Sequence, residues 1–133
     1  MPGFAEIIKA SADPAVGGEI VYTADENMIV HSCVVTLVTS AVAANRQAQL
    51  LADDGNAANV FYRAGTQTAI TASQTGTVSG VEGIPLQSFG GLSLISLPSM
   101  GLRLRKGDRL RTLTSGLDAG DNYGVMTIQA ERQ

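Results

Sequence analysis

The sequence is short of several residue types, and each shortage excludes a class of protein. Its 133 residues include one cysteine, one histidine and no tryptophan, and only 5% are aromatic. A single cysteine allows no disulfide within the chain, and Cys33, followed by two valines, is expected to be a buried apolar side chain. One histidine and one cysteine also cannot supply a typical zinc site. We therefore expect no disulfide framework, no metal and no cofactor.

Charge is scarce as well. Charged residues make up 16% of the chain, against about a quarter in an average globular protein, and the net charge is -3. An acidic balance argues against a protein that binds the nucleic-acid backbone, and a weakly charged polar surface favours burial against a partner. Glu6 and Lys9 interrupt the first segment, so no signal peptide is visible. The uncharged stretches 27–45 and 83–102 are too polar or too rich in Gly and Pro to cross a membrane.

The pattern that is present is that of strands. Apolar and polar residues alternate with a period of two, valine and threonine are frequent, and Gly, Pro and Asp separate the segments. The alternation predicts strands over residues 19–23, 28–39, 46–52, 60–64, 66–78 and 92–97, with residues 79–91 as a glycine-rich loop. For a chain of this size, eight or nine strands and almost no helix indicate an all-β protein, an antiparallel β-sandwich of the jelly-roll type.

The last third, residues 101–130, is expected to add three strands. Leu102 and Leu104 alternate with arginines, the sequence Lys106-Gly107-Asp108 is typical of a turn, and two further alternating segments follow. We interpret this region as an antiparallel meander. The length fits one domain, with residues 19–133 as the jelly roll and residues 1–18 as an N-terminal arm and loop. In that arm Phe4, Ile7 and Ile8 can pair as a short strand or reach onto a neighbouring subunit.

Candidate catalytic and metal-binding residues are few. His31 lies inside an apolar strand, and the sequence places no nucleophile or carboxylate beside it, so it is interpreted as an interior or interface histidine. The acidic turns Asp53-Asp54 and Asp118/Asp121 could hold calcium, but neither matches a complete calcium-binding loop. We interpret them as solvated turn carboxylates. No catalytic constellation is present, and we expect no enzymatic activity.

Four arginines flank the turn at residues 106–108 and are expected to project from one face of a hairpin: Arg103, Arg105, Arg109 and Arg111. Two interpretations remain open. They form a solvated face, or they form a cationic ridge that meets an acidic partner surface, where the planar guanidinium pairs well with carboxylates.

A series of turn and strand motifs extends over about residues 20–131: Ala44-Asn45-Arg46, Asp53-Asp54-Gly55, Val60-Phe61-Tyr62, Gly101-Leu102-Arg103-Leu104 with Lys106-Gly107-Asp108, and Ala119-Gly120-Asp121. In this order the series resembles small jelly-roll virion proteins of tailed bacteriophages. The resemblance implies a head decoration (cement) protein, usually trimeric, that binds over the junctions between major capsid subunits. The shorter element L-x-L-x-x-G-D is also similar to C1q-like and tumour-necrosis-factor-like jelly rolls.

We therefore expect a capsid decoration protein that forms a homotrimer and binds the major capsid protein. It would be made in the host bacterial cytoplasm and lie on the outer capsid surface of the virion. The alternative is a receptor-binding or glycan-binding jelly-roll module of a phage tail or fibre, which the low aromatic content makes less favourable. The residues expected at partner interfaces are Phe4, Ile7, Ile8, Ile84, Leu86, Phe89, Leu92, Arg103, Arg105, Arg109 and Arg111.

Overall fold

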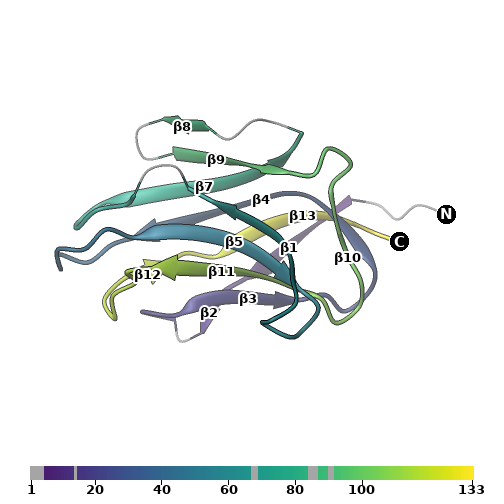
Figure 1. Cartoon of the computed structure of the whole chain (residues 1–133), viewed down its shortest axis with the longest axis horizontal. Coiled ribbons are helices and arrows are strands. Elements are labelled where there is room, and N and C mark those ends of the chain that lie inside the picture. The colour runs from purple at the N-terminus through teal and green to yellow at the C-terminus, as the bar shows by residue number, and fades with distance from the viewer. Residues whose placement is uncertain (1–4, 14, 67–68, 84–86, 90–91) are drawn as a thin grey trace.

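The computed structural model describes residues 5–13, 15–66, 69–83, 87–89 and 92–133, and all its regular elements are strands, β1 to β13 (Figure 1). None of the described residues is helical. The prediction of an all-β protein is confirmed. Short segments of period two, separated by turns, can bury one face in a sheet but cannot form the apolar stripe of a helix.

The strands form two sheets. In order across the large sheet lie β1 (Ala5–Ala10), β13 (Met126–Arg132), β4 (Met28–Val38), β7 (Thr75–Glu82), β9 (Leu92–Leu97) and β8 (Gln87–Phe89). Two short strands, β10 (Leu102–Leu104) and β12 (Asn122–Tyr123), also pair with β4. Across the small sheet lie β2 (Ala12–Asp13), β3 (Glu19–Thr23), β11 (Arg109–Ser115), β5 (Gln47–Asp53) and β6 (Val60–Gly65).

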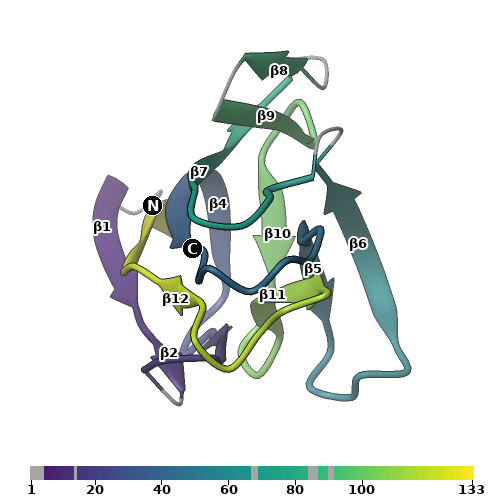
Figure 2. The ribbon, with the colours of Figure 1, turned by 90° about the vertical axis from the view of Figure 1, so that its left-hand side faces the viewer.

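The order of the strands is that of a jelly roll. The antiparallel set β1-β13-β4-β7 faces the antiparallel set β3-β11-β5-β6, and the chain crosses repeatedly from one sheet to the other, as between β3 and β4 and between β4 and β5 (Figures 1 and 2). This arrangement confirms the predicted antiparallel β-sandwich of the jelly-roll type. Strands β8 and β9 extend the large sheet beyond β7, and β9 runs parallel to β7.

The core lies between the two sheets. Fully buried apolar side chains from both inner faces meet there, among them Leu37, Ile95, Leu110, Met126 and Ile128. Their positions alternate along the strands with exposed or half-buried residues, as the period of two requires. Cys33 is one of the buried residues, and burial raises the pKa of its thiol to about 12, so it is the inert apolar side chain that was expected.

Three expectations about strand pairing and strand bounds are wrong. Residues 102–115 are not consecutive strands of a meander, because β10 pairs with β4 in the large sheet while β11 pairs with β3 and β5 in the small one. The strand expected over residues 66–78 begins only at Thr75, and Ile70 forms an isolated bridge with Arg46. The loop expected over residues 79–91 includes the end of β7 and all of β8. Local alternation identifies strand-forming residues but not their partners.

The N-terminal segment is a strand of the sandwich. All six residues of β1 pair with β13 of the same chain, and Ala10 is buried while Ile8 packs against the core. The jelly roll of the described chain therefore includes Ala5–Ala10, ahead of the boundary expected at residue 19.

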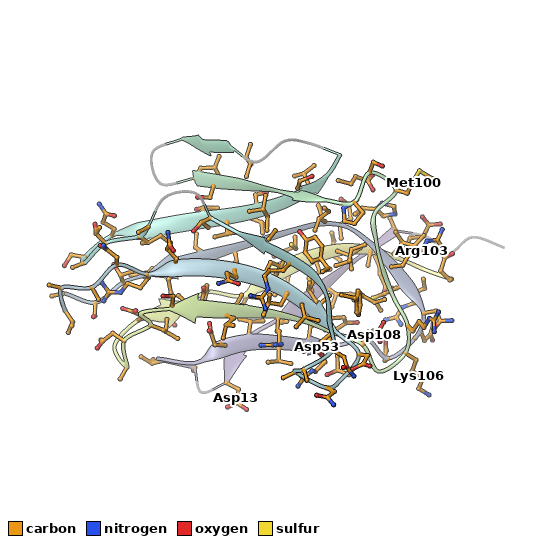
Figure 3. All side chains as sticks on the ribbon, in the orientation of Figure 1. Asp13, Asp53, Met100, Arg103, Lys106 and Asp108 are labelled. Atoms are coloured by element: carbon orange, nitrogen blue, oxygen red, sulfur yellow. The ribbon has the colours of Figure 1, made fainter. Side chains whose placement is uncertain are left out.

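The connections gather at two ends of the sandwich. At one end, loop residues 39–46, 69–74 and 116–121 meet, joined for example by a hydrogen bond from the Ser73 N–H to the Ser40 carbonyl; we call it the Asp121 end. At the other end, turns 24–27, 54–59 and 105–108 meet, and Ala24 exchanges backbone hydrogen bonds with Gly107 and Asp108. Figure 3 labels Arg103, Lys106 and Asp108 at this end, and we call it the cleft end.

Candidate partner surfaces

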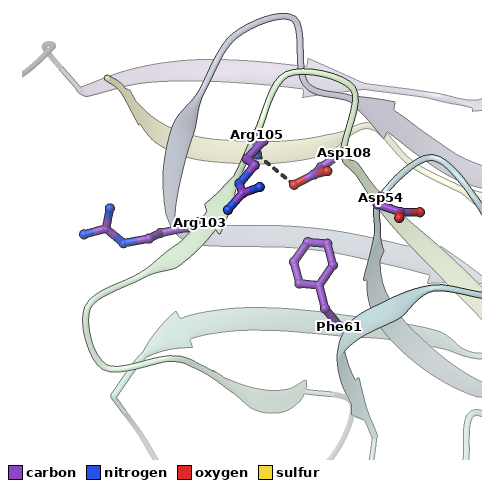
Figure 4. Close-up of a pocket in the computed structure, with 5 residues that line it drawn as sticks. All are labelled: Asp54, Phe61, Arg103, Arg105 and Asp108. Carbon is purple, nitrogen blue, oxygen red and sulfur yellow. Dashed lines mark hydrogen bonds between the residues drawn. The ribbon is translucent and has the colours of Figure 1, made fainter.

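A cleft of about 370 Å³ opens between the β5–β6 turn and the β10–β11 turn. Five side chains line it: Asp54, Phe61, Arg103, Arg105 and Asp108 (Figure 4). The two segments lie far apart in the sequence and meet because β5 and β11 are neighbours in the small sheet. Gly107, whose φ of +93° suits a residue without a side chain, closes the turn that carries Arg105 and Asp108.

Within the cleft the cations and the carboxylates differ in their partners. The Asp54 carboxylate accepts hydrogen bonds from the Asn56 N–H and from Asn59 Nδ2, and Asp108 Oδ2 accepts one from the Arg105 N–H at 2.7 Å. The guanidinium groups of Arg103 and Arg105 are exposed and form no hydrogen bond or ion pair with the residues that the structure describes. The cleft therefore offers unused guanidinium donors beside two carboxylates that accept hydrogen bonds from their own turns.

The other two arginines of the expected ridge are held inside the chain. Arg109 Nε lies 2.7 Å from Asp53 Oδ1, and Arg111 Nε lies 2.8 Å from Asp53 Oδ2, while the Asp53 side chain is fully buried. Hydrogen bonds from Arg109 and then Arg111 lower the pKa of Asp53 to about 2 against the burial that would raise it. The expected ridge is thus divided into an engaged pair and a free pair, and the interpretation of Asp53 as a solvated carboxylate is wrong.

The outer face of the small sheet is charged around this ion pair. Leu51 sits on that face with Arg111 and Arg63 as its neighbours on the adjacent strands, and it is fully buried although it lies outside the core. The aliphatic stems of long charged side chains can cover such a residue while their charged groups stay in water. The outer surface of the small sheet therefore carries arginine side chains, together with the exposed apolar side chains of Val21 and Leu113.

The outer face of the large sheet has the opposite character. Across its centre lie Thr127, Val34, Ser79 and Leu94, which are paired in register from β13 through β4 and β7 to β9. The next row along the same strands is Thr36, Thr77 and Leu92. None of these side chains is charged. We call these two rows, together with Val38 and Thr75 of the row that follows, the neutral face, and its exposed apolar members include Val34 (40% exposed) and Val38 (48%).

His31 lies at the margin of the neutral face, next to an irregularity in the pairing of β4 with β13. Its Nδ1 is 3.0 Å from Glu82 Oε2 and its Nε2 is 3.2 Å from Glu131 Oε2. The hydrogen bond to Glu82 and the weaker one to Glu131 raise the pKa of His31, although partial burial acts to lower it. Sequence reasoning placed no carboxylate beside this histidine, and the fold supplies two, from strands β7 and β13.

The Asp121 end contains the most deeply buried charges. The Arg46 and Asp121 side chains are both fully buried, with Arg46 Nε 2.9 Å from Asp121 Oδ2 and Nη2 3.0 Å from Oδ1. Arg46 also donates to the Ala44 carbonyl, and Asp121 accepts from the N–H groups of Ser40 and Asp118. Asp121 therefore anchors its own loop to the loop at residues 39–46, and its interpretation as a solvated turn carboxylate is wrong.

The remaining expected interface residues have different surroundings. Ile7 is 60% exposed on the outer side of β1, Ile8 packs against the core, and Leu92 is half-buried on the neutral face. Phe89 belongs to β8, but its side chain lies outside the described part of the structure. Phe4, Ile84 and Leu86 lie outside the described residues.

The described residues contain neither a metal-binding cluster nor a helix that could cross a membrane. No three side chains of His, Cys, Asp or Glu among them are grouped so that they could hold a metal ion. No helix in the described chain is both long and apolar enough to pass through a membrane.

The fold and these surfaces are compatible with a structural or binding module built on a jelly roll. No protein-family model and no curated protein matches the sequence. Solved structures with a similar fold include a CocE/NonD-family hydrolase from Staphylococcus aureus, with 10% identity and a TM-score of 0.45. The match covers 97% of this chain and 33% of the hydrolase.

Two further similar structures are a CBM35 module from Cellvibrio japonicus and a protein of the infectious bursal disease virus Gx strain. The module is 14% identical with a TM-score of 0.34, and 88% of this chain covers 65% of it. The viral protein is 12% identical with a TM-score of 0.35, and 96% of this chain covers 29% of it. The chain thus spans about a third of the first and last of these proteins, and likenesses this distant carry no argument about its function.

Proposed function

We propose that the chain is a virion structural protein of a tailed bacteriophage, namely a head decoration (cement) protein that associates with itself and binds across neighbouring major capsid subunits. The observation that carries the proposal is the neutral face of the large sheet. The centres of protein interfaces are depleted of charged residues, and a broad sheet face without charge is costly to leave in contact with water when apolar side chains are exposed on it. A second copy of the chain is the occupant we assign to this face.

The proposed protein would stabilise the capsid by binding alone and would catalyse no reaction. Apolar surface that is removed from water contributes about 25 cal/mol per Å² before the costs of association. A trimer on the outer capsid surface would attach through three equivalent sites, so that weak single contacts add up to stable attachment.

The test is the native mass of the purified protein by light scattering. We expect a trimer of about three times 13.8 kDa, and Val34→Lys, which places a charge at the centre of the neutral face, is expected to reduce it to a monomer. Leu113→Lys is the matched control, because Leu113 is exposed to a similar extent (42%) on the outer face of the small sheet. A monomeric wild-type protein, or equal effects of the two variants, would remove the neutral face as an interface.

Capsid attachment is tested separately, by sedimentation of the purified protein with empty capsids of the phage that encodes it. Binding at a fixed number of copies per capsid subunit supports the decoration role. A protein that stays in the supernatant at saturating concentration contradicts that role.

A second candidate function is glycan binding, because Phe61 is an exposed aromatic ring (50%) in a cleft that also contains arginine and aspartate side chains. Sugar rings stack on such aromatic faces and hydrogen-bond to polar groups beside them. Several competable hits on a glycan array, all lost in Phe61→Ala, would favour this function over decoration.

A further inference from the structure

The cleft end contains a second binding surface, distinct from the neutral face. Arg103 and Arg105 occupy alternate positions along β10 and the turn after it, so both side chains lie on the same side of the backbone. They line the cleft described above and also a neighbouring hollow of about 300 Å³ that includes Asn27, Met28 and Gln133. Both arginines are therefore among the lining residues of each hollow.

The unused groups of the cleft define the chemistry of its ligand. Both oxygens of Asp54 and Oδ2 of Asp108 already accept hydrogen bonds from their own turns. The two guanidinium groups have no partner among the described residues, and each presents several donors in a planar fork. A neutral sugar offers hydroxyl groups that donate as well as accept. A carboxylate only accepts, and it brings the negative charge that the two guanidinium groups do not meet among the described residues.

The surrounding strands favour an extended peptide as the carrier of these carboxylates. Among the described strands β10 pairs only with β4, so its other edge is open. An extended segment beside such an edge repeats every two residues and would place alternate side chains opposite Arg103 and Arg105. Phe61, from β6, lies across the cleft and offers an apolar contact to a neighbouring side chain of the same segment (Figure 4).

We propose that the cleft end binds an extended acidic segment of a partner protein, with carboxylate side chains two positions apart that pair with Arg103 and Arg105. The inference rests on the proposed function only in that the segment is assigned to the major capsid protein. Binding through exposed charge pairs is expected to be weak at a single site and to weaken further as salt is added. Three sites on one trimer would compensate for that weakness.

The experiment titrates the full-length protein with three synthetic peptides and follows the backbone amide and arginine Nε–H signals by NMR. The first peptide has the sequence Gly-Thr-Glu-Val-Glu-Thr-Gly with blocked ends. The second has glutamine in place of both glutamates, and the third has the same composition with the two glutamates adjacent. A glucuronic-acid disaccharide tests an anionic sugar as the alternative ligand.

We expect the first peptide to shift the signals of residues 101–108 and of Phe61, and to bind at least about tenfold more tightly than the glutamine peptide. The peptide with adjacent glutamates is expected to bind less tightly than the first. The variant Arg103→Gln/Arg105→Gln is expected to lose this binding. Arg63→Gln, which removes an exposed arginine from β6, is expected to retain it.

The proposal is wrong if the glutamine peptide binds as well as the glutamate peptide, if the double variant still binds, or if only the disaccharide binds. None of these results depends on trimer formation or on capsid attachment. If the protein is trimeric and binds capsids but does not bind the acidic peptide, the proposed function stands and this inference is wrong.

Discussion

The two ends of the sandwich use the same residue types for different purposes. At the Asp121 end, Arg46 and Asp121 are both fully buried and bind each other through two hydrogen bonds. At the cleft end, Arg103 and Arg105 are exposed and bind none of the described residues through their guanidinium groups. An arginine that pairs with a buried carboxylate of its own chain holds two loops together. An exposed arginine without such a pair is available to bind a partner.

The cluster of Asp53, Arg109 and Arg111, which we call the Asp53 cluster, is intermediate between a buried ion pair and exposed, unpaired arginines. It lies at the cleft end, yet its carboxylate is buried and holds both Arg109 and Arg111, which remain partly exposed. It keeps the neighbouring arginines out of the binding surface and positions the β11 strand against β5. A graded series of arginine environments therefore exists in one small domain, and substitutions can test it.

The largest effect is expected at the Asp121 end. Replacement Arg46→Met leaves a buried carboxylate without its cation, and breaking a buried ion pair in this way costs about 3–5 kcal/mol of the free energy of unfolding. At the cleft end, Arg105→Met is the matched control and is expected to change stability by less than about 0.5 kcal/mol. Urea unfolding at neutral pH measures both.

The double variant Arg46→Met/Asp121→Leu sharpens this test, because it removes both charges together. It is expected to be more stable than Arg46→Met alone, since no uncompensated charge remains buried. Equal losses in the Arg46→Met and Arg105→Met proteins would show that the two ends do not differ in the way described.

A smaller effect is expected at Asp53. Asp53→Asn keeps the shape of the side chain but leaves two arginines without their anion, and we expect a loss of about 1–3 kcal/mol at neutral pH. The pKa of Asp53 is lowered from 3.8 to about 2, so the folded protein binds fewer protons than the unfolded chain in this range. Its stabilising contribution is present above the unfolded pKa and is lost as the pH falls toward 2.

The stability gap between wild type and Asp53→Asn should therefore narrow as the pH is lowered from neutral to about 2, which thermal unfolding at several pH values can follow. Part of the acid sensitivity should remain in the variant. Burial acts to raise the pKa of Asp121, but hydrogen bonds from Arg46 and two backbone N–H groups outweigh it and lower that pKa to about 2. A gap that stays constant over this range would contradict the assignment.

The smallest effect concerns His31 at the cleft end. Its pKa is raised, mainly by the hydrogen bond to Glu82, so its contribution to stability is complete below the unfolded pKa and is lost as the pH rises through the folded value. We expect the change between about pH 6 and pH 8 to be below about 1 kcal/mol, because the cluster is partly exposed. The change should be absent in His31→Gln.

Because His31 is the only histidine, its ring protons can be followed directly by NMR. The titration midpoint is expected above 6.5 in the wild type and closer to 6.5 in Glu82→Gln. A wild-type midpoint at or below 6.5 would show that the two carboxylates do not hold the imidazolium.

Much of the strand content was predictable, because it depends on local alternation. Strand β3 at Glu19–Thr23 and strand β9 at Leu92–Leu97 have the predicted bounds, and β4 and β6 differ by one residue at one end. The prediction failed around Ile70, where threonine alternates with apolar residues but the chain forms a loop with one isolated bridge. It also failed where the identity of the neighbour matters, as for β10 and β11.

The candidate site was predicted only in part. Four arginines were predicted to share one face, as a solvated face or as a cationic ridge, and only Arg103 and Arg105 of the four line the cleft. Phe61 was recognised only as part of a strand motif, and its place opposite these arginines follows from the approach of the β5–β6 and β10–β11 turns. Neither the neutral face nor the ion pair between Arg46 and Asp121 was identified, because both combine residues from distant parts of the chain.

The sequence by itself determined that this chain forms strands with one face to bury, since the period of two decides which side chains of a strand lie on the same face. The tertiary structure alone decided which carboxylate meets which arginine. Asp53 and Asp54 are adjacent in the chain, yet one is buried between two arginines and the other is exposed at the cleft. A charge's role depends on its burial and on its neighbours in space, and no local pattern records either.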